Sequence, residues 1–168
     1  MERKTPLYQT HVDAGGKIVE FGGFLMPVQY PTGVLAEHMA VRQKAGLFDV
    51  SHMGELRLKG PDAVANVQKL ITADISAMQD GDIKYAMFCN DAGGILDDFI
   101  VYRCAADDYW LVVNAGNRDK DAAWVESHLF GDVDYRDEGD DWGQVALQGP
   151  KSGDILKKLC AEQYIPAK

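Results

Sequence analysis

The sequence predicts an α+β fold, in which mixed or antiparallel sheets and helices share one chain of 168 residues. Three apolar segments, residues 84–89, 95–103 and 109–114, have the length and the β-branched and aromatic content of strands. Gly93-Gly94 lies between the first two, and this pair predicts a hairpin because glycine adopts positive φ without steric cost. Apolar residues also recur at helical spacing before and after these strands. The two periodicities together indicate the α+β class.

Turn residues divide the chain into short elements. Glycines follow most of the apolar segments, because glycine tolerates the positive φ of turns and helix ends. Leu35, Met39 and Val41 recur at helical spacing and predict an amphipathic helix. The expected elements, in order, are a helix over residues 7–14, strands over 17–21 and 24–30, a helix over 34–45, a strand over 56–59, a helix that begins at Pro61 and has Val64, Val67, Leu70 and Ile71 on its apolar face, strands over 84–89, 95–103 and 109–114, and a helix from Asn117 to Leu129.

A strand followed by Gly-Pro and a helix occurs twice, at an offset of 89 residues. The two copies begin with Leu56-Arg57-Leu58-Lys59-Gly60-Pro61 and Val145-Ala146-Leu147-Gln148-Gly149-Pro150. Gly-Pro after a strand is common, so this match alone is a weak repeat. A genuine repeat means two similar strand-helix-strand units. The second stops at Lys168, before the strands that its twin possesses, so we expect the chain to be a fragment.

Composition argues against several classes of function. A net charge of −9 and a pI near 4.8 disfavour nucleic acid, whose binding requires a basic patch. The sequence contains neither a signal-peptide core nor a membrane-spanning apolar stretch. The three cysteines lack C-x-x-C spacing, and His11, His38 and His128 stand alone, so no disulfide framework or metal site is expected. We expect a reducing compartment, the cytoplasm, with no nucleic-acid or membrane partner.

Two adjacent acids, Asp97 and Asp98, lie inside the apolar strand over residues 95–103. Successive strand residues point to opposite faces, so each acid is expected among the hydrophobic residues of a different face. Burial of a carboxylate is costly unless the group is paired or hydrogen-bonded. One interpretation is that an acid pairs structurally with Arg103 or Lys84. The other is a half-buried carboxylate that orients or deprotonates a nitrogen-bearing substrate.

Other polar and aromatic residues lie near the ends of the predicted strands. Asn114 and Asn117 lie where a strand ends and a helix begins, and an asparagine there offers a ligand both a donor and an acceptor. An ordinary helix cap explains Asn117 at least equally well. Tyr85 and Met87 fit the wall of a flat-ring pocket, although core packing is the favoured interpretation. Ser51-His52 is not expected to be a catalytic pair, because adjacent strand residues point apart and no G-x-S-x-G motif is present.

Several short segments, spread over essentially the whole chain, carry a resemblance to a known family. They are Thr5-Pro6-Leu7-Tyr8, Gly16-Lys17-Ile18-Val19-Glu20-Phe21, Met26-Pro27-Val28-Gln29-Tyr30, Phe48-Asp49-Val50-Ser51-His52-Met53, Gly93-Gly94-Ile95-Leu96-Asp97-Asp98, Val113-Asn114 with Lys120-Asp121, and Leu147-Gln148-Gly149-Pro150. In order and spacing these segments resemble the aminomethyltransferase (T-protein) of the glycine cleavage system. The single segments are weak signals, whereas their combination is specific.

The resemblance implies a fold and a reaction. The implied fold is the folate-binding T-protein-like fold without its C-terminal half, with residues 1–50 and 140–168 in an incomplete first domain and residues 51–139 in a second α+β domain. The family takes an aminomethyl group from the lipoylated H-protein, releases ammonia and passes the one-carbon unit to tetrahydrofolate. Tetrahydrofolate is thus the acceptor substrate, and no metal is implied. We expect the chain by itself to be inactive.

The resemblance also assigns site residues. Asp98 falls on the family's catalytic aspartate, near the folate nitrogens, where a carboxylate accepts or steers a proton and stabilises an iminium-like centre. Met53, Tyr85 and Asn114, together with Asp98, fall on positions that line the pterin pocket. Asp97, on the opposite face, is expected to be a structural partner. Two alternatives stay open: a non-catalytic folate-binding or partner-docking fragment, and a related folate-dependent demethylase.

Overall fold

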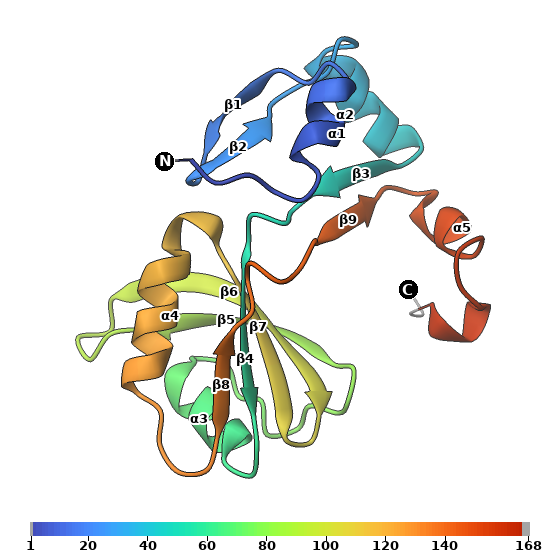
Figure 1. Ribbon diagram of the computed structural model, residues 1–168. Helices are drawn as coiled ribbons and strands as arrows, with labels where there is room; N and C mark the ends of the chain where they lie inside the picture. The colour runs from blue at the N-terminus through green and yellow to red at the C-terminus, as the bar shows by residue number, and fades with distance from the viewer. Residues whose placement is uncertain (1, 166–168) are drawn as a thin grey trace. The chain divides into compact units, whose positions relative to one another are not determined.

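The computed structural model describes residues 2–165 and divides the chain into two compact units (Figure 1). The first unit combines the residues up to Ser51 with those from Gly143 onward. The second unit is the continuous segment His52–Trp142. The assignment of these units to the domains of a T-protein stays a prediction.

The first unit contains two small antiparallel sheets, each of two strands. One pairs β1 with β2, joined through Gly22-Gly23, whose φ angles are +58° and +86°. The other pairs β3 with β9, which lie far apart in the sequence. The elements of this unit are α1 (Tyr8–Asp13), β1 (Ile18–Phe21), β2 (Phe24–Pro27), α2 (Val34–Gln43), β3 (Gly46–Asp49), β9 (Val145–Gln148), α5 (Ser152–Leu156) and the short 3-10 turn η2 (Glu162–Tyr164).

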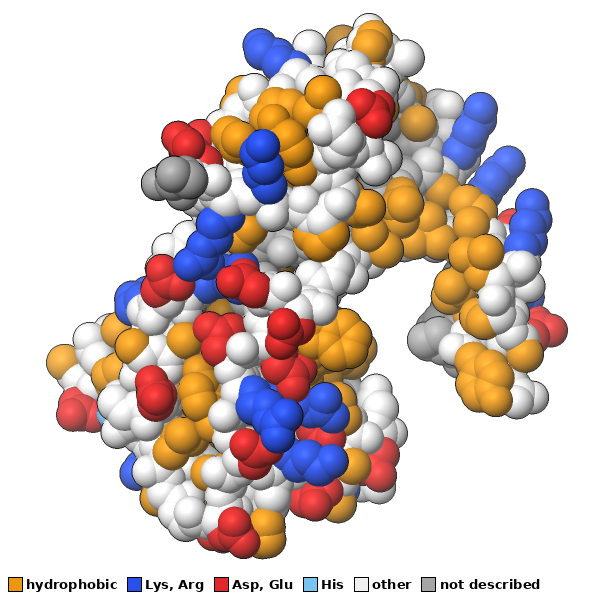
Figure 2. Space-filling view, in the orientation of Figure 1, with side chains coloured by type: hydrophobic (Ala, Val, Ile, Leu, Met, Phe, Trp, Pro, Cys, Tyr) orange, Lys and Arg blue, Asp and Glu red, His pale blue; other side chains and the backbone are white. Residues whose placement is uncertain are grey.

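Helix α2 forms where the periodicity predicted it, but its expected apolar face is not buried. Leu35 is 83% exposed and Met39 is 46% exposed, and no residue of the helix is fully buried within the described chain. Further exposed apolar side chains lie on β3, β9 and α5, where Figure 2 shows them gathered. The apolar residues of α2 therefore do not pack on a large core among the described residues of this unit.

The second unit is built on a five-stranded antiparallel sheet in the order β5-β6-β7-β4-β8. The β5–β6 hairpin turns at Gly93, whose φ is +80°, as the Gly-Gly pair predicts. The elements of this unit are β4 (Gly54–Lys59), α3 (Ala63–Leu70), β5 (Ile83–Cys89), β6 (Ile95–Ala105), β7 (Asp108–Val113), η1 (Ala115–Asn117), α4 (Arg118–Ser127) and β8 (Asp134–Asp137).

One face of this sheet carries the core. Helices α3 and α4 lie on the same side of the sheet (Figure 1), and Val67 and Val125 bring them into one apolar cluster with Leu58, Phe99 and Leu111. All five side chains are at most 3% exposed. The helices therefore cover only one face of the sheet, and the residues that alternate with the core residues point to the opposite face, which we call the outer face.

Helix α3 differs from its prediction at its start. It begins at Ala63, with Asp62 at the N-cap position, so Pro61 lies in the preceding turn and not at the first helical position. Ala63 is fully buried, whereas Val64, expected on the apolar face, is 36% exposed. Because the helix starts later than predicted, its first turn directs Ala63 and not Val64 toward the sheet.

The repeated strand-helix segments share their turn geometry. Gly60 follows β4 with a φ of +132°, and Gly149 follows β9 with a φ of +107°. A Cβ at Gly60 would lie 2.8 Å from the carbonyl oxygen of Asp132, and one at Gly149 would lie 2.6 Å from that of Val41. Both copies therefore require glycine for the same two reasons, backbone conformation and close approach of another main chain.

The helices and the acidic, histidine and cysteine side chains show two further features. Within residues 2–165, every helix is too short or too polar to cross a lipid bilayer. In the same part of the chain, His, Cys, Asp and Glu side chains form no group of three that is placed to hold a metal ion.

Candidate functional site

Strand register places the predicted site residues at one end of the outer face. Met87 is paired with Asp98 across β5 and β6. The β6–β7 register, continued by two residues, brings Asp98 opposite Asn114, and the β4–β7 register, continued by one, brings Asn114 opposite Met53. Met53 is half-buried and directly precedes β4. The four neighbouring chain positions thus form a row across the sheet, with Tyr85 diagonal to it.

Tyr85 and Asp98 are in direct contact on this face. The Tyr85 hydroxyl donates a hydrogen bond to Oδ2 of Asp98, and this bond raises the pKa of the Tyr85 hydroxyl. Tyr85 is 62% exposed, so the interpretation of this residue as core packing is wrong. Asp98 is also exposed and not half-buried as expected, because Asp98, like Ile100, lies on the face of β6 that the helices leave uncovered.

Asp97 points to the opposite side of β6 and is 6% exposed. It does not pair with Arg103 or Lys84: Arg103 binds Asp80, and Lys84 donates to the carbonyl oxygen of Asp74. Asp97 instead accepts three hydrogen bonds from two asparagines. They come from the Asn114 main-chain N at 3.2 Å, from Asn114 Nδ2 at 3.1 Å and from Asn117 Nδ2 at 2.7 Å.

Asn117 occupies the N-cap position of α4 without acting as a cap. Its side chain makes no capping hydrogen bond and is directed to the Asp97 carboxylate. The carboxylate of Asp119 lies in the first turn of the helix, where negative charge is favoured. The cap expected at this position is therefore replaced by a link between the helix start and strand β6.

Asp121 lies behind this link and is fully buried. Burial and the neighbouring Asp97 raise the pKa of the Asp121 carboxyl, and its hydrogen bond with Asp97 contributes to that shift. Burial would raise the pKa of Asp97 as well, but the hydrogen bonds from Asp121, Asn114 and Asn117 hold it below its usual range. The two shifts are opposite in direction, so Asp121 keeps its proton up to a higher pH than Asp97 does. The sequence offered no signal for Asp121 beyond its place in a segment of the resemblance.

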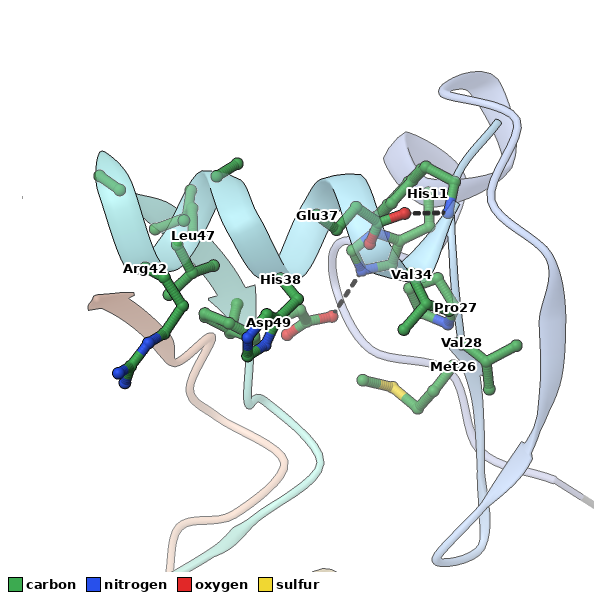
Figure 3. Close-up of a pocket in the computed structure, with 16 residues that line it drawn as sticks. His11, Met26, Pro27, Val28, Val34, Glu37, His38, Arg42, Leu47 and Asp49 are labelled. Carbon is green, nitrogen blue, oxygen red and sulfur yellow. Dashed lines mark hydrogen bonds and ion pairs between the residues drawn. The ribbon is translucent and has the colours of Figure 1, made fainter. Parts of the chain in front are cut away.

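A separate cavity of about 550 Å³ lies in the first unit, between α1, α2, β2 and β3 (Figure 3). Met26, Val28 and Val34 contribute apolar walls, and His11 lies on the polar side. The sequence predicts that His11 stands alone, but in the structure it has two polar partners. Its Nε2 lies 2.9 Å from Oδ2 of Asp49, and its Nδ1 lies 2.7 Å from the hydroxyl of Tyr30. These polar groups satisfy one another, so the cavity presents mainly apolar surface.

Comparison with known proteins gives the family of the chain. Residues 7–167 match the model of the GCVT N-terminal domain. The chain belongs to this aminomethyltransferase family. It is 51% identical over 158 residues to the aminomethyltransferase of Desulfitobacterium hafniense and 50% identical over 159 residues to that of Staphylococcus haemolyticus.

A solved structure agrees with this assignment. The crystal structure of the glycine cleavage system aminomethyltransferase T from Bartonella henselae matches with a TM-score of 0.92 at 36% identity, over 98% of this chain and 46% of that one. The matches to the two bacterial relatives above cover 94% of this chain but only 43% of each relative's own length. The chain therefore spans less than half the length of its relatives, and it has the α+β T-protein-like fold that the sequence predicts.

Proposed function

We propose that the chain contributes the folate-facing half of a tetrahydrofolate-dependent aminomethyltransferase of glycine cleavage. In that reaction the carbon of a lipoyl-bound aminomethyl group on the H-protein is transferred to tetrahydrofolate, ammonia leaves, and the lipoyl arm is released as a thiol. Tetrahydrofolate and the lipoylated H-protein are the proposed partners, and the cytoplasm is the proposed location. The family membership and the resemblance of the site residues support this proposal.

The observation that carries the proposal is the row of polar and apolar side chains on the outer face. Asp98 is the exposed carboxylate of the row, and Tyr85 donates to it from the next strand. Aromatic and methionine side chains form walls that suit a flat heterocycle, while a few polar groups fix its orientation. The arrangement therefore offers both a surface for a pterin ring and an anionic group beside it.

Asp98 is the proposed catalytic residue. A carboxylate beside the reacting nitrogens of folate accepts a proton as the new carbon–nitrogen bond forms, and it stabilises the positive charge of an iminium-like centre. Tyr85 holds this carboxylate through its hydroxyl. Met53 and Asn114 complete the proposed pterin contacts from the neighbouring strand ends.

Calorimetric titration of the chain with 5-formyltetrahydrofolate tests the binding part of the proposal. We expect saturable binding that falls at least about fivefold in Asn114→Ala, the loss expected for one hydrogen bond. Asp91→Asn is the matched control, because Asp91 is an exposed acid at the hairpin turn and outside the row. Absence of saturable binding, or equal affinity in wild type and Asn114→Ala, would contradict the proposal.

A further inference from the structure

Asn114 is held in one orientation by acceptors on two sides. Its Nδ2 donates to Oδ1 of Asp97 at 3.1 Å and to the main-chain oxygen of Asp98 at 2.7 Å. A flipped amide would direct its own oxygen at these two acceptors, and three acceptors cannot bond to one another. The NH₂ group must therefore face Asp97 and Asp98.

The orientation leaves the Asn114 carbonyl oxygen for another partner. An asparagine amide has two N–H donors, and both are used by Asp97 and Asp98. Oδ1 accepts no hydrogen bond within residues 2–165, and it is not among the buried polar atoms without a partner. Oδ1 of Asn114 is thus a hydrogen-bond acceptor for which no donor among the described residues competes.

Asp121 completes the support from the core side. Two ionised carboxylates are acceptors only, so contact between Asp97 and a fully buried Asp121 requires one proton between them. The ammonium group of Lys120 lies 3.8 Å from Oδ1 of Asp121 and donates its hydrogen bond elsewhere, to the carbonyl oxygen of Leu96 at 2.5 Å. Asp97 accepts three hydrogen bonds from Asn114 and Asn117, whereas neither oxygen of Asp121 accepts one within the described residues. The proton is therefore more stable on Asp121, which then donates to Asp97.

We propose that Asp97, hydrogen-bonded to Asp121, is a positioning residue that turns the Asn114 carbonyl oxygen toward the ligand, so that this position selects a ligand carrying an N–H donor. This inference rests on the proposed function for the identity of the ligand, a pterin, whose ring and amino nitrogens supply such donors. Asp97 acts only through Asn114 and does not touch the ligand. Asp97, on the core side of the sheet, thus determines that Asn114 presents a hydrogen-bond acceptor to the ligand.

The test begins with the amide of Asn114 and needs no ligand. In the ¹⁵N-labelled chain, we expect the Nδ2 protons of Asn114 to exchange slowly with solvent, because both are hydrogen-bonded. Asp97→Asn should accelerate this exchange at least about tenfold, since an amide at position 97 cannot accept from all three donors. Asp121→Asn retains a donor to Asp97 and should keep slow exchange, whereas Asp121→Leu should lose it. The main-chain amides of β6 and β7 report whether each variant is folded.

Titration with 5-formyltetrahydrofolate supplies the second measurement. We expect about a tenfold weaker affinity in Asp97→Asn and Asp121→Leu, with recovery to within about threefold of wild type in Asp121→Asn. Unchanged amide exchange and unchanged affinity in folded Asp97→Asn would overturn the positioning role. If Asp97→Asn fails to fold, slow exchange in Asp121→Leu would overturn it instead. Slow exchange in wild type without any ligand binding would contradict the proposed function and leave the positioning role supported.

Discussion

At the scale of the residue, strand parity separates the two adjacent acids into different roles. Asp97 faces the core side and accepts bonds from Asn114 and Asn117, whereas Asp98 faces the outer side and binds Tyr85. Each carboxylate is stabilised by its own set of donors, which offsets the desolvation of the buried one. Alternation along a single strand thus places one acid on the core side of the sheet and the other on its outer face.

Replacement of the exposed acid separates transfer from binding. Asp98→Asn keeps an oxygen that accepts from the Tyr85 hydroxyl, so we expect the affinity for 5-formyltetrahydrofolate to change by less than about tenfold. Introduced at the aligned position of the full-length Desulfitobacterium hafniense relative, the same change should lower the rate of transfer by about 100-fold or more, as for a lost acid–base group. Calorimetry and an assay with H-protein and tetrahydrofolate measure the two effects. Equal losses in binding and rate would refute the catalytic role.

Another buried acid predicts a pH dependence of stability. Glu55 on β4 is 1% exposed, and burial, with Asp137 and Asp140 nearby, raises the pKa of its carboxyl to about 7 despite the opposing effect of Arg118. Glu138 adds to the same rise. A raised pKa means that the folded state holds the proton more tightly than the unfolded state. The stabilisation is therefore complete below the unfolded pKa of 4.5 and is lost as the pH rises to about 7.

Glu55→Gln removes this titration. We expect the variant to gain about 2–3 kcal/mol of unfolding free energy relative to wild type between pH 4.5 and pH 8, because the pKa of Glu55 rises from 4.5 in the unfolded chain to about 7 in the folded one. Urea unfolding at several pH values measures the difference. Glu126→Gln, at an exposed position of α4, is the control and should leave the pH profile unchanged. A parallel profile for Glu55→Gln and wild type would contradict the assignment.

At the scale of the element, the sequence predicts most strands and helices of the second unit but not β8, an edge strand of its sheet. The alternation of Tyr85 to Phe88 and of Asp97 to Val101 is visible in the sequence because their core-facing side chains are buried. Strand β8 (Asp134–Asp137) was not predicted, because its residues are polar and largely exposed at the edge of the sheet. Its position is set by pairing with β4, which is a tertiary effect.

The site was less predictable than the fold. The opposite faces of Asp97 and Asp98 follow from the period of a strand. The role of Asn117 does not follow from this period. Its side chain can bond either to the helix start or to a carboxylate on β6, and the tertiary packing determines which bond forms. Asp121 likewise gives no sign in the sequence that it is buried against another acid.

The glycines after the repeated strands give a prediction for these elements. Alanine at Gly60 or Gly149 would combine positive φ with a Cβ less than 3 Å from a main-chain oxygen. We expect each change to lower the unfolding free energy by about 1–3 kcal/mol, the cost of such backbone strain. Gly116→Ala is the control, because a Cβ there meets no atom within 4 Å. Chemical denaturation measures the loss, and equal stability of Gly60→Ala and Gly116→Ala would contradict the argument.

At the scale of the whole molecule, the two units differ in how much apolar surface they bury. The main core cluster, from Leu56 to Val125, lies entirely within His52–Trp142. The buried apolar side chains of the first unit, among the described residues, are Phe24 and Met26. Apolar burial is the dominant stabilising contribution in folding, so the second unit should be the more stable one.

Hydrogen exchange tests this difference. We expect the main-chain amides of β4, β6 and β7 to be protected at least about 100-fold more strongly than those of β3 and β9, because the first unit opens at lower free energy. The segment His52–Trp142, expressed alone, should also unfold cooperatively, since it contains its own core. Equal protection of both groups of strands would contradict this account.

The most direct test of the central claim is to map where a folate binds. Titration of the ¹⁵N-labelled chain with 5-formyltetrahydrofolate should shift the main-chain resonances of Tyr85, Asp98 and Asn114 and leave those around His11 and Asp49 unchanged. Such a pattern would place the ligand on the outer face of the second unit. Shifts confined to the cavity of the first unit, or no shifts at saturating ligand, would contradict the claim.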